Sequence, residues 1–327
     1  MIITKTPYRI SLFGGGTDMP EWFERHGGAV LSFSIDKYCY LLCRDLPPYF
    51  DHRFHLSYSR VETVSDIEDI QHPAIREGIR LYTPLRNIEI GHHSDLPARS
   101  GIGSSSAFAV GLVNSLNLLN GNRLTKQELA RHAIKLEQEY IRESVGSQDQ
   151  VACAMGGLNL IRFGGKGKWE IEPILIGISQ KEDFEDRIFL VFSGISRLSS
   201  DITKGLLDNL ETKKGELEAL QEIAFEGYKI LVKDENLDLF GPLLKQSWEL
   251  KKRSNKLSSV AEVDNVIDHG LEHGALGAKV LGAGGGGFIL FWLKSGDKER
   301  FRSVFKMGTY VPVKIDSLGA TTLESNF

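Results

Sequence analysis

Apolar and polar residues alternate over several stretches of this chain, which is the pattern of a strand with one buried face. The alternation predicts strands at residues 2–13, 29–45, 86–92, 157–163, 187–193, 278–293 and 308–315. In the stretch 278–293 a run of glycines after Leu281 interrupts the pattern, so we expect two strands joined by a glycine turn. Strands are therefore expected at both ends of the chain.

Capping residues and apolar periodicity predict helices between these strands. Asp18 and Glu21 have the spacing of a capping box, with Pro20 in the first turn, and Thr125 and Glu128 repeat that spacing. The predicted helices span residues 18–26, 105–119, 125–143 and, with breaks, 200–273. This order of elements lacks the regular alternation of a doubly wound parallel sheet, so the sequence favours the α+β class.

The length of 327 residues exceeds what a single ordinary core holds, so we expect two domains. A polar segment follows an apolar one near residue 180, which divides the chain into domains of residues 1–180 and 181–327. No repeat or low-complexity linker interrupts either part.

Composition and charge exclude several classes of partner. Hydrophobic residues make up 41% and charged residues 25%, with a formal net charge of −4, so we expect neither nucleic acid nor an anionic membrane as partner. The N-terminus lacks the pattern of a signal peptide, and no apolar run approaches the roughly 20 residues that span a bilayer. Together with three cysteines, an odd number, this predicts a cytoplasmic protein with reduced thiols.

Small and polar residues stand directly before the helix predicted at 105–119. The segment Gly101-Ile102-Gly103-Ser104-Ser105-Ser106 could expose the unpaired N–H groups of the helix N-terminus to an anion, most often a phosphate. A simple helix cap with a flexible approach explains the same residues, since serine is among the best caps. The segment is not a Walker A loop, because that motif occurs nowhere in the chain.

A carboxylate interrupts the apolar face of the helix predicted at 125–143. Ala130, Ala133, Ile134 and Ile141 follow the spacing of one buried face, and Glu137 occupies a position within it. A buried carboxylate must be paired or must ligate a cation. Both a salt bridge and a Mg²⁺ site therefore remain open for Glu137.

Three further charged residues are candidates for chemistry. Arg9 lies within an apolar strand, where a guanidinium needs a carboxylate or phosphate partner. Asp149 lies in a turn of small and amide residues, as a cap or as a general base. Asp18 follows three glycines and a threonine, as a helix cap or as an acceptor for sugar hydroxyls. Together with the glycine–serine segment, these residues supply the parts of a phosphoryl-transfer site.

Two other motifs are set aside. Gly282, Gly284 and Gly287 match a dinucleotide fingerprint, but a strand pattern follows them and too little chain remains for a βαβ unit, so we do not expect a nicotinamide enzyme. His269 and His273 have the spacing of two zinc ligands on a helix. We expect no third ligand near them, which favours a solvated helix end.

Three motifs, in order along the chain, resemble those of the GHMP superfamily of small-molecule kinases. They are TPYRISLFGGGTD (6–18), DLPARSGIGSSSA (95–107) and KVLGAGGGGFIL (279–290). The second departs from the usual P-x-G-x-G-L-G-S-S-A, with Arg99 at the first glycine and Ile102 in place of leucine. The resemblance implies a ribosomal-protein-S5-like N-terminal domain, a ferredoxin-like C-terminal domain and an active site in the cleft between them.

The resemblance also implies the cofactors and the role of each site residue. ATP and Mg²⁺ would be required, with Asp149 and Arg9 as catalytic residues, Arg9 lying beside Asp149. The other residues are Ser100, Gly101, Ile102, Gly103, Ser104, Ser105 and Ser106 for the ATP phosphates, Ser105 and Glu137 for Mg²⁺, and Thr17, Asp18, Gly157, Arg197 and Gly285 for the substrate.

Within the superfamily, the motifs are most similar to those of D-glycero-D-manno-heptose 7-phosphate 1-kinases. L-fucokinases share the G-G-G-T-D sequence and remain an alternative, as do galactokinase-like enzymes and non-catalytic sugar sensors. A substrate phosphate would need its own cations, and Lys37, Arg44 and Arg197 are candidates. The expected partner is thus a small sugar or sugar phosphate, and the resemblance leaves a homodimer open.

Overall fold

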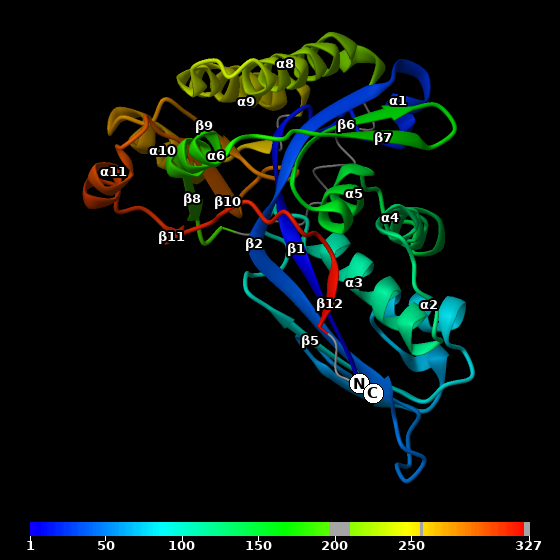
Figure 1. Ribbon diagram of the computed structural model, residues 1–327. Helices are drawn as coiled ribbons and strands as arrows, with labels where there is room; N and C mark the ends of the chain where they lie inside the picture. The colour runs from blue at the N-terminus through cyan, green and yellow to red at the C-terminus, as the bar shows by residue number, and fades with distance from the viewer. Residues whose placement is uncertain (196–209, 256–257, 324–327) are drawn as a thin grey trace.

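A computed structural model describes residues 1–195, 210–255 and 258–323 of the chain (Figure 1). It contains two antiparallel-rich sheets with helices packed against both, so the α+β expectation is confirmed. The larger sheet has eight strands: β1 (Ile2–Phe13), β2 (Gly28–Asp45), β3 (Phe54–Ser57), β4 (Val61–Val64), β5 (Ile88–Ser94), β6 (Leu158–Gly164), β7 (Lys168–Pro173) and β12 (Thr321–Leu323).

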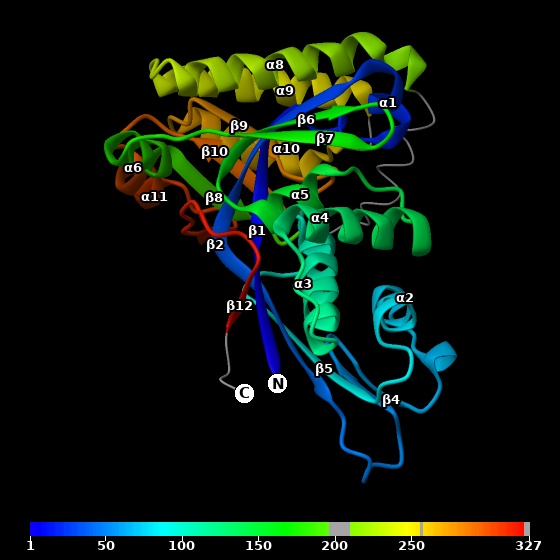
Figure 2. The same cartoon turned by 45° about the vertical axis from the view of Figure 1, so that its right-hand side comes forward.

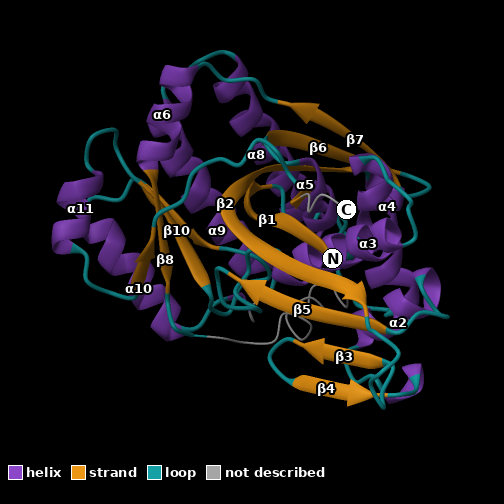
Figure 3. Cartoon of the chain, turned by 60° about the horizontal axis from the view of Figure 1, so that its bottom comes forward, coloured by secondary structure: helices purple, strands orange, loops and turns teal. Residues whose placement is uncertain are grey.

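The long strand β2 organises the larger sheet. It pairs with β1 along most of its length, with β6 through residues 28–33 and with β5 through residues 39–45. The path β12-β1-β2-β5-β3-β4 therefore carries a second branch, β6 and β7, and Figure 3 shows β5, β3 and β4 in succession. The register of β1 against β2 shifts beside Arg9 and near Ser11, at the end of β1 that leads into the site.

Helices cover one side of this sheet. They are α1 (Pro20–His26), α2 (Pro73–Tyr82), α3 (Ser104–Leu119), α4 (Lys126–Lys135) and α5 (Gln148–Met155), with a π-helical turn at Leu136–Tyr140 and a 3₁₀ turn at Ile67–Asp69. Helix α3 packs on β1 and β2, and Figure 2 shows it running along the sheet with α2 on its outer side. Because α3 is buried nearly all round, its N-terminus is held firmly at the edge of the site.

The smaller sheet has the order β11-β8-β10-β9. Its strands are β8 (Ile188–Phe192), β9 (Gly277–Val280), β10 (Phe288–Trp292) and β11 (Thr309–Val311). The remaining helices are α6 (Ile178–Arg187), α8 (Lys214–Val232), α9 (Phe240–Ser254), α10 (Ala261–Glu272) and α11 (Lys298–Val304), with 3₁₀ turns at Glu211–Lys213 and Leu237–Leu239. Helices α8 and α9 lie side by side in Figures 1 and 2.

Strands β1 to β7 precede residue 180 and form the larger sheet, whereas β8 to β11 follow it and form the smaller one. The last strand, β12, returns to pair with β1, which brings both ends of the described chain to the same place (Figure 1). The division into residues 1–180 and 181–327 remains a proposal, with β12 crossing back to the first sheet.

Most predicted elements are present, with local corrections. The helix expected at 18–26 begins at Pro20 after Met19, so Asp18 does not cap it. The capping box of Thr125 and Glu128 is confirmed, but regular α-helix ends at Lys135 and the π-helical turn follows. Patterning missed the helices α2, α5, α6 and α11 and the short strands β3, β4, β7 and β12, because brief elements carry little periodicity. Asp149, expected in a turn, therefore lies in the first turn of α5.

Candidate active site

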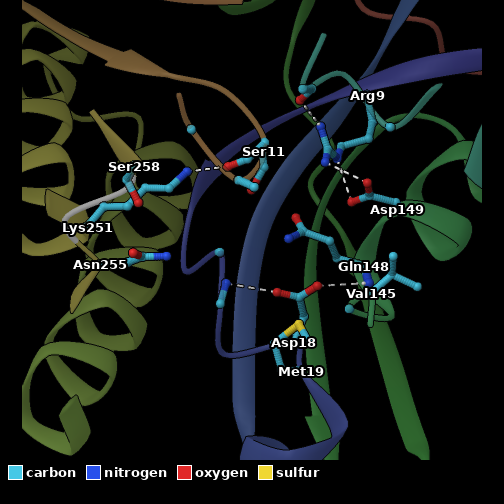
Figure 4. A pocket seen from close by; sticks show the side chains of 18 of the residues that line it. Arg9, Ser11, Asp18, Met19, Val145, Gln148, Asp149, Lys251, Asn255 and Ser258 are labelled. Atoms are coloured by element: carbon cyan, nitrogen blue, oxygen red, sulfur yellow. Dashed lines mark hydrogen bonds and ion pairs between the residues drawn. The ribbon is translucent and has the colours of Figure 1, made fainter. Parts of the chain in front are cut away.

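A pocket opens where the two sheets meet, bounded by the end of β1, the N-terminus of α3, the start of α5 and helix α9. Figure 4 shows Arg9 and Asp149 on one side of it, Lys251, Asn255 and Ser258 on the other, and Asp18 between them. Residues far apart in sequence thus line one cavity, and all three glycine-containing motifs contribute to its wall.

Arg9 and Asp149 form a bidentate ion pair. Arg9 Nε donates to Asp149 Oδ1 over 2.8 Å, and its Nη2 donates to Oδ2 over 2.7 Å. Arg9 Nη1 also donates to the carbonyl oxygen of Gly101 over 2.8 Å, so the same guanidinium holds the glycine loop. Asp149 keeps 23% of its side chain exposed and faces the pocket, while Arg9 is almost buried. The ion pair fixes the orientation of the Asp149 carboxylate and leaves part of this carboxylate accessible from the pocket.

Asp18 is buried beside this pair. Its Oδ1 accepts from the amide of Gly16 over 2.9 Å, and its Oδ2 accepts from the amide of Gln148 over 3.3 Å. Burial raises the pKa of Asp18, and the neighbouring Asp149 carboxylate raises it further. Asp18 thus joins the first glycine motif to the start of α5 and lines the pocket.

Glu137 lies behind Ser105, in the π-helical turn, with 1% of its surface exposed. Ser105 Oγ donates to its Oε1 over 2.8 Å, and Gln150 Nε2 donates to its Oε2 over 2.6 Å. Burial raises the pKa of Glu137 to about 7. No arginine or lysine among the described residues pairs with this carboxylate, so the salt-bridge alternative is not supported there. A carboxylate and a hydroxyl form the oxygen donor set that Mg²⁺ prefers.

The glycine–serine segment enters α3 in the manner of an anion cradle. Gly101 and Gly103 have φ values of 86° and 74°, and α3 begins at Ser104. Gly101 also touches the third glycine motif, since a Cβ on it would lie 2.5 Å from the carbonyl oxygen of Leu281. The two loops therefore pack backbone to backbone, and the first turn of α3, Ser104 to Ser106, lines the pocket, where a helix N-terminus can bind an anion.

Several residues predicted for substrate or phosphate do not reach the pocket wall. Thr17 is buried, and its hydroxyl donates to the carbonyl of Gly14 over 2.7 Å and accepts from the amide of Ala29, so it locks the glycine turn. The others turned away are Ser100, Ile102, Gly157 and Gly285, whose backbones bond to Phe288, Arg9, Asp316 and Ser258 respectively. Arg197 lies outside the described residues.

Two lysines in the pocket escaped the sequence prediction. Lys251 projects from α9 and Lys279 from β9, and both line the cavity. Lys251 lies seven residues after Leu244 on the buried face of α9, and Lys279 lies in a fully buried strand. A charged residue within an apolar stripe indicated that Glu137 and Arg9 belong to a site. The same pattern in the sequence also indicates Lys251 and Lys279. Of the phosphate-binding candidates, Lys37 pairs with Asp36 and Arg44 with Glu89, and neither lines the pocket.

A third possible metal ligand lies beside His269 and His273 at the end of α10. Glu272 lies with His269 and His273 at the end of the helix, its carboxylate and the ring nitrogens within 4.8 Å of one another. The expectation that no third ligand is near was wrong. His273 Nδ1 bonds to the carbonyl oxygen of His269 over 2.7 Å, as the last turn of a helix allows.

Comparisons with known proteins agree with this architecture. The family model "GHMP kinases N terminal domain" matches residues 70–157, and "GHMP kinases C terminal" matches residues 216–306. The chain is similar to D-glycero-alpha-D-manno-heptose 7-phosphate kinase of Campylobacter jejuni, at 30% identity over 89% of each chain. It is 24% identical, over 90% of its length, to a stretch covering 30% of the bifunctional fucokinase/GDP-fucose pyrophosphorylase of Arabidopsis thaliana.

Among solved structures, the fold resembles a D-glycero-D-manno-heptose 1-phosphate kinase from Bacteroides thetaiotaomicron. The TM-score is 0.82 at 22% sequence identity, and each chain is covered completely. A galactokinase from Lactococcus lactis, complexed with galactose, has a TM-score of 0.75 at 19% identity, with 98% of this chain and 95% of the other covered. In the part of the chain that the structure describes, none of the helices has the length and apolar character needed to cross a bilayer.

Proposed function

Because this chain belongs to the GHMP kinase family and is a phosphotransferase with a hydroxyl group as acceptor, we propose that it is an ATP-dependent sugar 1-kinase. The proposed acceptor is the anomeric hydroxyl of D-glycero-D-manno-heptose 7-phosphate, in keeping with the name of the Campylobacter jejuni relative. The observation that carries the proposal is the Arg9–Asp149 pair, which lies beside the glycine–serine cradle at the N-terminus of α3.

The cradle is proposed to hold the phosphates of ATP. Backbone N–H groups of the first turn of α3 and the hydroxyl of Ser104 offer donors on the pocket wall, while the hydroxyl of Ser106 bonds to Glu137. Ser105 and Glu137 would hold Mg²⁺, which supplies positive charge to the phosphate oxygens when bound. Glu137 gains a cation in that role, which explains why a carboxylate is buried there with only hydroxyl and amide partners.

The acceptor is proposed to lie between the two aspartates. Asp18 accepts hydrogen bonds from ring hydroxyls, and Asp149 accepts the hydrogen bond of the anomeric hydroxyl. Asp149 takes that proton as the anomeric oxygen bonds to the γ-phosphorus of ATP, while the bond from this phosphorus to the bridging oxygen breaks and ADP leaves. Arg9 uses three of its five N–H groups on Asp149 and Gly101, so two remain for the oxygens of the transferred phosphoryl group. Positioning and charge stabilisation supply most of the rate in such transfers.

A coupled assay of ADP release over several sugars tests this function. Purified protein with ATP and Mg²⁺ is offered heptose 7-phosphate, fucose, galactose or mannose, and the position of the new phosphate is assigned by NMR. The proposal expects the highest kcat/KM for heptose 7-phosphate, with phosphate added at the anomeric carbon. Preference for fucose or galactose would assign the chain to those kinases, and binding of sugar and ATP without ADP release would indicate a sensor.

A further inference from the structure

The two pocket lysines have no acidic partner in the described structure. Lys279 Nζ donates to the carbonyl oxygens of Ser11 and Leu12, at 3.3 and 2.8 Å, and Lys251 Nζ donates to the carbonyl oxygen of Gly282. None of the described carboxylates forms an ion pair with either ammonium group, although the charge of Asp18 acts on Lys251 and raises its pKa. Arg9 differs from both, because Asp149 already neutralises it.

Burying an ammonium group without an anion beside it costs free energy. Lys279 is 4% exposed, and burial lowers the pKa of Lys279 and brings the pKa of Lys251 to about 8. Carbonyl oxygens offer only partial negative charge, so they compensate the lost hydration in part. An anion that binds between the two lysines would compensate the hydration that their ammonium groups lose on burial.

The space around the lysines is polar and open. Ser11 lines it with a buried hydroxyl that has no hydrogen-bond partner among the described residues, while Ser247, Asn255 and Ser258 line the side near Lys251. At Gly15 a Cβ would meet nothing closer than the Ser11 hydroxyl, 3.4 Å away. Packing therefore does not require glycine at position 15, and the missing side chain leaves volume in front of Ser11.

The position of the aspartates decides which anion fits. Phosphates of the nucleotide are already provided for by the α3 cradle and by Ser105 with Glu137. An acceptor bound through Asp18 and Asp149 must turn any dianionic group away from these carboxylates, because like charges repel. Lys251 lies across the pocket from Asp149 in Figure 4, which is where such a group would point, and Lys279 lines the same pocket at the carbonyls of Ser11 and Leu12.

We propose that Lys251 and Lys279, together with Ser11 and Asn255, bind a phosphate group that the acceptor sugar already carries. This inference rests on the proposed function and names what makes the site selective for a sugar phosphate over a free sugar. Two charge-assisted contacts to one phosphate give this selectivity, since a free sugar leaves both ammonium groups unpaired.

Lys251→Gln tests the subsite, with Lys245→Gln, an exposed lysine on the same helix, as the matched control. We expect the KM for heptose 7-phosphate to rise about 10- to 100-fold in Lys251→Gln. The KM for ATP and the kcat/KM for dephosphorylated heptose should stay near wild-type values, and Lys251→Arg should recover part of the loss. Lys245→Gln should behave as wild type.

Calorimetric titration of heptose 7-phosphate without nucleotide separates the two proposals. Wild-type protein should bind it at least about tenfold more tightly than Lys251→Gln, and inorganic phosphate should compete. Equal binding by both proteins overturns the subsite, and so does an equal fall in kcat/KM for phosphorylated and free heptose. Tight binding by wild type without ADP release overturns the proposed function alone, whereas absence of binding overturns both.

Discussion

Arg9, Glu137 and Lys279 share one property at the scale of single residues. Each is a charged side chain in an otherwise apolar strand or helix, and each is held by polar groups of another element. Burying a charge costs free energy unless a partner or ligand compensates it. Charged residues in apolar elements are therefore more specific indicators of the pocket than the glycines are.

Replacing Asp149 by Asn should remove most of the activity. The amide keeps the shape of the side chain but cannot take a proton, so we expect kcat to fall at least about 100-fold. Thermal unfolding should show that the protein stays folded, and ATP should still raise the Tm. Asp268→Asn, at an exposed position on α10, serves as the control. An active Asp149→Asn protein would remove the aspartate from the proposed chemistry.

Glu137 should make stability depend on pH. Burial raises its pKa from 4.5 to about 7, so in this interval the folded protein keeps a proton that the unfolded chain releases. The free energy of unfolding of the metal-free protein should therefore fall as pH rises from 4.5 to 7. Urea denaturation at several pH values should show a smaller fall in Glu137→Gln.

The Gln variant is compatible with the fold. Its carbonyl oxygen can accept from Ser105, and its amide can donate to Oε1 of Gln150, which has no partner in the described structure. The same pH slope in both proteins would contradict a raised pKa at Glu137.

At the scale of elements, two loops and one helix end make the cradle. The loop before α3 and the loop between β9 and β10 touch through their backbones, at Gly101 and Gly282. Arg9 adds a bond to the carbonyl of Gly101, and Phe288 donates its amide to the carbonyl of Ser100 over 3.0 Å. The position of the α3 N-terminus thus depends on a strand from each sheet.

Gly101→Ala should separate these loops. Its Cβ would lie 2.5 Å from the carbonyl oxygen of Leu281, whereas Gly121, with a similar φ of 76°, has no heavy atom within 4 Å. Gly121→Ala therefore carries only the backbone cost of about 1 kcal/mol, and Gly101→Ala should lose roughly 1–3 kcal/mol more. Chemical denaturation gives the difference, and the KM for ATP should rise only in Gly101→Ala. An equal loss of stability in Gly101→Ala and Gly121→Ala would mean that the two loops are not in tight contact.

At the scale of the whole molecule, one apolar core joins the two sheets. Phe33 of β2 contacts Phe184 of α6 edge to face at 5.4 Å, and Phe184 contacts Trp292 of β10 at 5.2 Å. Phe13 of β1 contacts Phe240 of α9 at 5.3 Å. The pocket therefore lies on a continuous core, although its walls come from both sheets.

This continuity predicts a single unfolding transition. Two domains with a small interface would unfold separately, whereas a shared core couples them. We expect the calorimetric and van't Hoff enthalpies to agree, and the transitions followed by near-UV and far-UV circular dichroism to coincide. Two resolved transitions would show that the shared core does not couple the sheets.

Sequence alone was enough for the longer strands, for several of the helices and for part of the site, but it missed α5, which carries Asp149. The motif order led to the family, and charges within apolar stripes led to Arg9 and Glu137. Lys251 and Lys279 carry the same signal, because each is a charge within an apolar stripe. The resemblance implied a substrate role for Thr17, whereas the packing of the glycine turn on β2 shows that its hydroxyl bonds to the backbone.

What the sequence determined by itself is local: the period of each strand, the cap at Thr125, and the residue types that phosphoryl transfer needs. Tertiary structure decided which of these residues meet, because side-chain direction depends on register and on the contacts between elements. Asp18 and Asp149 are 131 positions apart, and they became neighbours because the amides of Ser147 and Gln148 donate to Asp18. The sequence could not place the lysines opposite them, since that depends on how α9 and β9 pack on the end of β1.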